Sequence, residues 1–242
     1  MKEKIINYFK NKDNCMALLS IGIYCAIMYG LVELIYFMIK HFFKESFIAS
    51  NINGIVLFIN VFIYIILFAA LIPISLKKIK NDWFISRNDT ANTARYIVIG
   101  IIVMYGASFI ASLISIMLSS QTSTNQDSIN SIINHSKLFY WIMFPIIGFI
   151  GPICEELVFR HSIFKLIKND TISLIVSSIL FCLIHMDGQA GGVIDFIAVA
   201  INYLASGLAL GFTYIYSKRN ITITIFIHVL NNVVSLLMLS IF

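Results

Sequence analysis

Charged residues are scarce in this 242-residue sequence. Only 12% of its residues are Asp, Glu, Lys or Arg, and 59% are hydrophobic, whereas soluble domains are roughly 25% charged and 45–50% apolar. A chain with so few polar side chains does not cover a soluble core, so the composition excludes an ordinary soluble domain. The net charge of +5 is therefore interpreted by its position relative to a membrane, and no nucleic-acid partner is expected.

Several sequence patterns with known chemistry are also missing. No Cys-x-x-Cys pair is formed by the four cysteines, Cys15, Cys25, Cys154 and Cys182, which therefore indicate packing rather than a disulfide frame or a zinc knuckle. There is no Gly-x-Ser-x-Gly nucleophile motif and no His-Glu-x-x-His zinc motif. The first apolar run, 15–39, is too long for a signal peptide and lacks a clear cleavage site, which predicts a retained helix.

Long apolar runs, by contrast, are abundant. A helix that spans the hydrocarbon core of a bilayer needs about 20 mostly apolar residues. Seven stretches qualify, of which the fourth carries charges and the fifth is short: 15–39, 52–76, 95–118, 138–167, 171–186, 193–216 and 221–242. The predicted fold is all-α, a polytopic transmembrane helix bundle of about seven spans. Three amino-terminal helices with their loops fall in 1–137, and a four-helix core falls in 138–242.

The basic residues divide unequally between the two sides of these spans. Fourteen of the 17 Lys and Arg residues fall on the side of the amino terminus, and the other side holds only Lys40, Lys44 and Lys137. Because Lys and Arg accumulate in cytoplasmic loops, we expect a cytoplasmic amino terminus, an external carboxyl terminus and an external loop at 119–137. The small size and the Ile-, Asn- and Lys-rich composition indicate an integral plasma membrane protein of a bacterium.

Three polar clusters interrupt the apolar spans. A charge at the middle of a bilayer costs about 2.5–3.5 kcal/mol on insertion scales, so charges there are rare unless they are paired or functional. Each cluster contains two residues four positions apart, a spacing that places both side chains on one face of a helix. The pairs are Glu156 with Arg160, directly after Glu155; Phe181 with His185; and His228 with Asn232.

The depth of these residues predicts that they meet. At a rise of about 1.5 Å per residue, Glu155, His185, His228 and Asn232 lie roughly 12 to 22 Å above the cytoplasmic ends of their spans. The hydrocarbon core is about 30 Å thick, so the four side chains are predicted to share one pocket inside the membrane. A Gly- and Pro-containing stretch, 148–152, is expected to loosen the span that carries the carboxylates.

Each pair taken alone has a structural interpretation. A Glu–Arg pair at this spacing is most often a structural ion pair, a single buried His is more often hydrogen-bonded than catalytic, and a His with an Asn commonly joins membrane helices. Convergence at one depth favours a functional site, because three unrelated structural features would not share it.

The four residues have the parts of an amide hydrolase. A carboxylate beside a histidine can hold and deprotonate a water molecule, and a second His with an Asn can donate hydrogen bonds to a developing oxyanion. Glu155, His185 and His228 also have the donor types of a catalytic zinc site, and that alternative stays open. Asn232 fits an oxyanion role better, because Asn is a poor zinc ligand.

In this order along the chain, each on a different membrane helix, the patterns EExxxR, FxxxH and HxxxN resemble the CAAX protease and bacteriocin-processing family (CPBP, or Abi) of intramembrane proteases. The resemblance covers about 138–242, and the rest of the chain is similar only in forming membrane helices. It implies that Glu155 activates the water, that His185 helps to hold it, and that His228 and Asn232 form the oxyanion site.

The resemblance also implies supporting roles. Glu156 would be structural and paired with Arg160, and Phe181 would support the site. The family's structural picture favours a glutamate-activated water without an obligatory metal, so no cofactor is favoured and zinc is the alternative. One departure is His161, which follows the Arg where many family members have Gly.

The predicted function is an intramembrane endopeptidase that cuts peptides or proteins presented from the lipid bilayer. For a bacterial member, the resemblance implies bacteriocin self-immunity or peptide-pheromone processing. Two other functions stay open. One is a catalytically silent family member that binds and regulates a membrane partner such as a sensor kinase. The other, less favoured because no inverted repeat is visible, is a small transporter with Glu155 and His185 as a proton relay.

Overall fold

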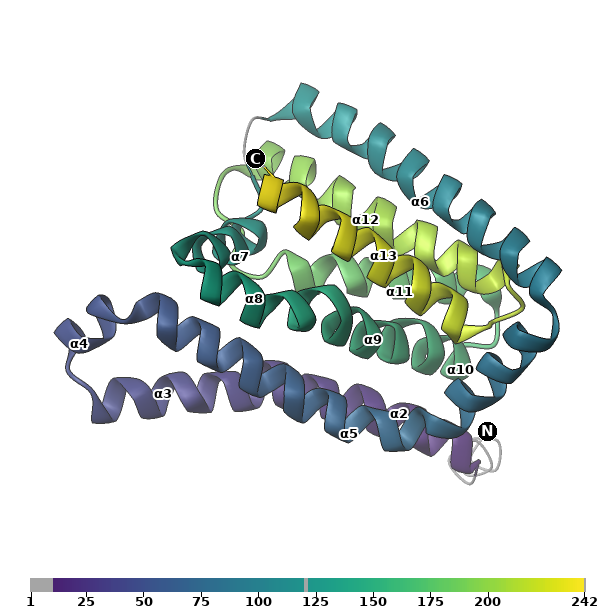
Figure 1. Cartoon of the computed structure of the whole chain (residues 1–242), viewed down its shortest axis with the longest axis horizontal. Coiled ribbons are helices and arrows are strands. Elements are labelled where there is room, and N and C mark those ends of the chain that lie inside the picture. Colours follow the sequence, from purple (N-terminus) through teal and green to yellow (C-terminus); the bar gives the residue numbers. More distant parts are fainter. Residues whose placement is uncertain (1–10, 120–121, 242) are drawn as a thin grey trace.

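A computed structural model describes residues 11–119 and 122–241, and each regular element in those ranges is a helix (Figure 1). The amino-terminal half begins with one continuous helical span made of α2 (Lys12–Cys25), a π-helical turn η1 (Ala26–Leu31) and α3 (Val32–Phe42). It continues with the short α4 (Glu45–Ser50) and the long α5 (Ile52–Asn88) and α6 (Thr90–Leu118).

The carboxyl-terminal half begins with α7 (Thr124–His135) and then has a span of changing helical type. This span consists of α8 (Lys137–Pro145), η2 (Ile146–Ile150), α9 (Gly151–Glu156), η3 (Leu157–Ser162) and α10 (Ile163–Leu166). Three further helices follow, α11 (Asp170–His185), α12 (Val193–Tyr216) and α13 (Ile221–Ile241).

Six of the described helical spans are long and apolar enough to cross a membrane. The seventh predicted span, α11, is apolar but has 16 residues, a length of about 24 Å that falls short of a hydrocarbon core of about 30 Å. The predicted polytopic helical bundle is therefore confirmed, and the chain is a membrane protein.

The span from Lys137 to Leu166 lies at the centre of the bundle. Of its most apolar window, 61% is buried inside the protein, against 17–33% in the other five spans. Leu67 and Leu71 of α5 and Cys154, Leu157 and Phe164 of this span have no exposed surface and belong to one core cluster. Figure 1 shows α9 running between α5 and α13, so the residues that follow Cys154 are held inside the protein.

Two π-helical turns flank the carboxylates of this central span. The turn η2 precedes α9 and the turn η3 follows it. Pro145 and Pro152 have no backbone N–H, so the regular hydrogen-bond ladder is interrupted twice in this region. The loosening predicted for 148–152 is present in this form, and π-helical turns of this kind are frequent at functional sites.

The external loop predicted at 119–137 is largely helical. Ser123 caps α7, because its hydroxyl accepts a hydrogen bond from the backbone N–H of Gln126 at 3.3 Å. Ile132 and Ile133 of α7 are buried beside Leu57 of α5 and Met143 of α8. A helix of 12 residues is too short to be recognised as a transmembrane span. The sequence therefore did not predict α7.

The carboxyl-terminal part of α5, which extends beyond the predicted span 52–76, fixes the beginning of α13. The buried carboxylate of Asp82 accepts a hydrogen bond from the backbone N–H of Ile221 at 2.7 Å, and Lys78 donates to the same carboxylate at 2.8 Å. Negative charge at the amino end of a helix is stabilising. This contact therefore sets the position of the helix that carries His228 and Asn232.

Candidate active site

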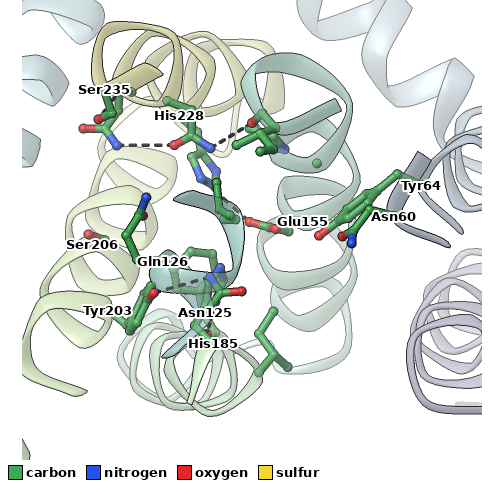
Figure 2. A pocket seen from close by; sticks show the side chains of 18 of the residues that line it. Asn60, Tyr64, Asn125, Gln126, Glu155, His185, Tyr203, Ser206, His228 and Ser235 are labelled. Atoms are coloured by element: carbon green, nitrogen blue, oxygen red, sulfur yellow. Dashed lines mark hydrogen bonds and ion pairs between the residues drawn. The ribbon is translucent and has the colours of Figure 1, made fainter. Parts of the chain in front are cut away.

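A cavity of about 340 Å³ is lined by helices from both halves of the chain. Glu155 on α9, His185 at the end of α11, and His228 and Asn232 on α13 all line it. Figure 2 shows the first three of these side chains around one space, with the histidines reaching it from different helices. The shared pocket predicted from helical rise is therefore present.

His228 connects the two adjacent carboxylates. Its Nδ1 lies 2.9 Å from Oε1 of Glu156, and its Nε2 lies 3.7 Å from Oε2 of Glu155. A carboxylate in an ion pair accepts hydrogen bonds, so Nδ1 of His228 donates to Glu156. In the neutral ring Nε2 then has no proton, and His228 can donate through Nε2 only as an imidazolium. The sequence predicted a pairing of Glu156 with Arg160 alone, and the contact of Glu156 with His228 was not foreseen.

His185 is held in one tautomer by its own helix. Its Nδ1 lies 2.8 Å from the backbone carbonyl oxygen of Phe181. A carbonyl oxygen only accepts, so Nδ1 carries the proton and Nε2 of the neutral ring is left as an acceptor. Nε2 of His185 and the carboxylate of Glu155 are therefore both hydrogen-bond acceptors that line the same cavity.

The amide of Asn232 is also fixed. Its Nδ2 donates to the backbone carbonyl oxygen of Ile147 in η2 at 3.0 Å, and the side chain of Asn231 donates to its Oδ1 at 3.4 Å. An amide nitrogen has two N–H groups, so one of them can still serve a group in the cavity. The π-helical turn thus supplies the carbonyl that orients this amide.

The predicted supporting residues form a buried network behind the cavity. Arg160 donates to Oε1 of Glu156 at 2.9 Å, and neither side chain has exposed surface. Arg160 also donates to the carbonyl oxygen of Gly207 on α12 at 3.1 Å and lies over the ring of Phe181, 4.7 Å from its centroid. Phe181 in turn contacts His185, at a centroid separation of 4.5 Å. The Glu156–Arg160 pair therefore reaches both histidines.

The side chains around the cavity include the donor types of a metal site. In 11–119 and 122–241, no group of three or more His, Cys, Asp and Glu side chains is arranged to hold a metal ion. Nδ1 of His185 and Nδ1 of His228 are both engaged, with Phe181 and Glu156 respectively. Engagement of Nδ1 leaves Nε2 of each ring as the free nitrogen, so zinc stays the alternative to a glutamate-activated water. No step below is derived through a metal.

Comparison with known proteins covers the segment that carries every predicted site residue. Residues 137–234 are similar to one known family. They match a family model described as type II CAAX prenyl endopeptidase Rce1-like, which confirms the resemblance predicted from the three motifs. The family supports a CAAX-protease type of enzyme in broad terms, and the division of the chain at 137 and 138 stays a prediction.

Curated relatives are similar over part of their length. An uncharacterized protein of Mycoplasma capricolum is 30% identical over 105 residues, which are 43% of this chain and 30% of the relative. The UPF0177 proteins YxdF and YaiH of Lactococcus lactis are 39% identical over 77 residues and 36% identical over 97 residues. The first match covers 31% of this chain and the second 38%, and each covers 37% of the relative. The chain thus spans about a third of the length of these relatives. No solved structure matches significantly.

The structure adds cavity residues from outside the Rce1-like segment. Asn60 and Tyr64 of α5 line the cavity, and Figure 2 shows both beside Glu155. The ring of Tyr64 lies against Gly151, one helical turn before Glu155. Asn60 and Tyr64 are four residues apart in an apolar span, the same spacing that marked the three motifs, and this signal could have found them.

His161, the departure from the family pattern, lies outside the lining of the cavity. Its side chain is half-buried in η3, and the charged groups that act on it are Lys78, Asp82, Lys165 and Asp13. These groups lie at the end of the bundle predicted to face the cytoplasm. The structure therefore gives His161 no contact with the candidate catalytic residues.

Proposed function

We propose that the protein is an intramembrane endopeptidase that hydrolyses peptide bonds of membrane-presented peptides or proteins with a water activated by Glu155. The observation that carries this proposal is the meeting of Glu155, His185 and His228 in one cavity, with Nε2 of His228 lying 3.7 Å from Oε2 of Glu155. The Rce1-like match over the same segment supports the reaction class.

The reaction begins with a water held between the Glu155 carboxylate and Nε2 of His185. Glu155 takes one proton from this water as the hydroxyl oxygen attacks the carbonyl carbon of the scissile peptide bond. The carbonyl oxygen becomes an oxyanion and accepts hydrogen bonds from the free N–H of Asn232 and from the His228 imidazolium. Glu155 then passes its proton to the amide nitrogen, the carbon–nitrogen bond breaks, and a carboxylic acid and an amine are released.

The experiment that tests this function is hydrolysis in water enriched in oxygen-18. Purified full-length protein in liposomes is incubated with a library of membrane-embedded peptides, and the products are analysed by mass spectrometry. We expect new carboxyl termini that each carry one heavy oxygen atom from the solvent. Native membranes of the same cells serve as the reference for which peptides can be cut. If the purified protein cleaves none of those peptides, the proposal is contradicted.

Hydrolysis is expected without stoichiometric zinc, because the described donor set does not assemble a three-ligand site and Asn232 replaces a good ligand. Metal content is measured by mass spectrometry on the same samples used for cleavage. One tightly bound zinc per chain, with activity lost to a chelator and restored by zinc, would favour the metalloprotease mechanism instead.

A cytoplasmic amino terminus follows from the excess of basic residues on one side of the spans. Asn81 at the end of α5 and Ser128 on α7 are both exposed, so each is replaced singly by cysteine in a variant that lacks the four native cysteines. A membrane-impermeant maleimide should label Ser128→Cys in intact cells and Asn81→Cys only after permeabilisation. The reverse pattern would invert the orientation, and labelling of both in intact cells would indicate a miscounted span.

A further inference from the structure

The imidazole of His185 lies between two aromatic rings. On one side is Phe181, whose ring centroid is 4.5 Å away at an interplanar angle of 40°. On the other is Tyr203 of α12, at 4.7 Å and 27°, which is close to parallel stacking. The backbone of Phe181 fixes the proton on Nδ1 of His185, but one hydrogen bond does not fix the tilt of the ring about that bond. The stacked ring of Tyr203 fixes this tilt.

Tyr203 is held opposite His185 by the packing of α11 against α12. Cys182 lies on α11, one turn before Met186. Its thiol donates a hydrogen bond to the carbonyl oxygen of Ala200 on α12 at 3.4 Å. Cys182, Met186 and Val199 form a buried cluster on which Tyr203 packs. The two helices therefore place the Tyr203 ring at a defined distance from the imidazole.

The hydroxyl of Tyr203 has a different set of partners. It lies 2.7 Å from Oγ of Ser123, and Nδ2 of Asn125 donates to it at 3.4 Å. Both partners belong to the beginning of α7, and Figure 2 shows Tyr203 joined to Asn125 beside His185. The hydroxyl thus connects a helix that lines the cavity to the ring that stacks on His185.

A second attachment limits the movement of α7 at the same end. The backbone N–H of Thr124 donates to the side chain of Gln189 at 2.9 Å, and the N–H of Ala190 donates to the hydroxyl of Thr124 at 3.3 Å. Gln189 and Ala190 follow His185 closely in the chain. A displacement of the beginning of α7 therefore acts on His185 by two routes. One is through Tyr203, and the other is through Gln189 and Ala190.

We infer that Tyr203 is a positioning residue for His185. Its ring fixes the plane of the imidazole so that Nε2 faces the cavity, and its hydroxyl makes that position depend on the placement of α7. The inference rests on the proposed function in one respect only, which is that the acceptor nitrogen of His185 holds the attacking water. The arrangement of the ring itself is testable without any substrate.

The test uses the full-length protein with Tyr203→Leu, which removes the ring, and Tyr203→Phe, which removes only the hydroxyl. Tyr216→Leu is the matched control, because Tyr216 also lies on α12 and stacks on Phe212, outside the cavity lining. The first readout is the rate at which diethyl pyrocarbonate modifies His185, followed by mass spectrometry. Loss of an aromatic stack should raise this rate about 2- to 10-fold in Tyr203→Leu, with no change in the control.

The second readout is steady-state cleavage. In Tyr203→Leu we expect kcat to fall by about 10- to 100-fold with little change in KM, because a small misplacement of a catalytic group is costly. Tyr203→Phe should retain kcat within about threefold, since it keeps the stacked ring. It should also increase deuterium exchange in 123–135.

Unchanged modification of His185 in folded Tyr203→Leu would overturn the role of the ring. Unchanged exchange in 123–135 of Tyr203→Phe would overturn the role of the hydroxyl. If Tyr203→Leu does not fold, Tyr203→Met takes its place and is judged by the same criterion. If the wild type cleaves no peptide, the proposed function fails, yet the modification and exchange measurements still decide the inference.

Discussion

Replacement of Glu155 by glutamine is expected to lower the rate of peptide cleavage by about 10²- to 10⁴-fold, the usual contribution of a positioned general base. Glutamine has nearly the shape of glutamate and keeps a hydrogen-bond acceptor, but it cannot take a proton from water. The side chain is 9% exposed and lies within the cavity, so the substitution introduces no cavity and no new charge. Single-turnover cleavage normalised to folded protein measures the effect.

Glu33→Gln is the matched control for this experiment. Glu33 is exposed on α3 and lies outside the cavity lining, so the same change of chemistry there should leave the rate unaltered. Near wild-type cleavage by Glu155→Gln would contradict the protease mechanism. A Glu155→Gln protein that keeps its full biological effect in cells without cleaving anything would favour a protein that binds and regulates a membrane partner.

The placement of the membrane helices could be predicted from the sequence because the bilayer imposes a minimum apolar length. Helix α11 was found by its composition, although its 16 residues are short. The interruption of the central span was also predictable, since Pro152 cannot donate a backbone hydrogen bond. Helix α7 was not predictable in this way, because it is polar and its few buried side chains contact the distant α5 as well as the adjacent α8.

The candidate site was predictable as a set but not in its internal contacts. Rise along a helix gives depth, so Glu155, His185 and His228 could be placed at one level. Rotation of α13 about its axis decides which carboxylate each ring nitrogen meets, and no sequence spacing within one helix specifies that rotation. The contact between His228 and Glu156 therefore appeared only in the structure, as did the stacking of Tyr203 on His185.

Glu156→Gln is expected to destabilise the protein by about 3–5 kcal/mol, because it leaves the charge of Arg160 buried without a counter-charge. Both side chains are fully buried and 2.9 Å apart, so water cannot replace the lost partner. Unfolding in mixed micelles, followed by circular dichroism, measures the change. The control is Asp13→Asn, which breaks the exposed bridge between Asp13 and Lys165 and should cost less than about 1 kcal/mol.

A double variant separates the buried charge from the hydrogen bond to His228. Glu156→Gln with Arg160→Met leaves no charge at either position, and the amide oxygen of the glutamine can still accept from Nδ1 of His228. We expect the double variant to be more stable than Glu156→Gln alone, because the penalty comes from the unpaired Arg160 guanidinium rather than from loss of shape. If the loss of unfolding free energy in the double variant equals the sum of the losses in the two single variants, the two residues do not act as a pair. Destabilisation would then come from the other contacts of Arg160, with Gly207 and Phe181.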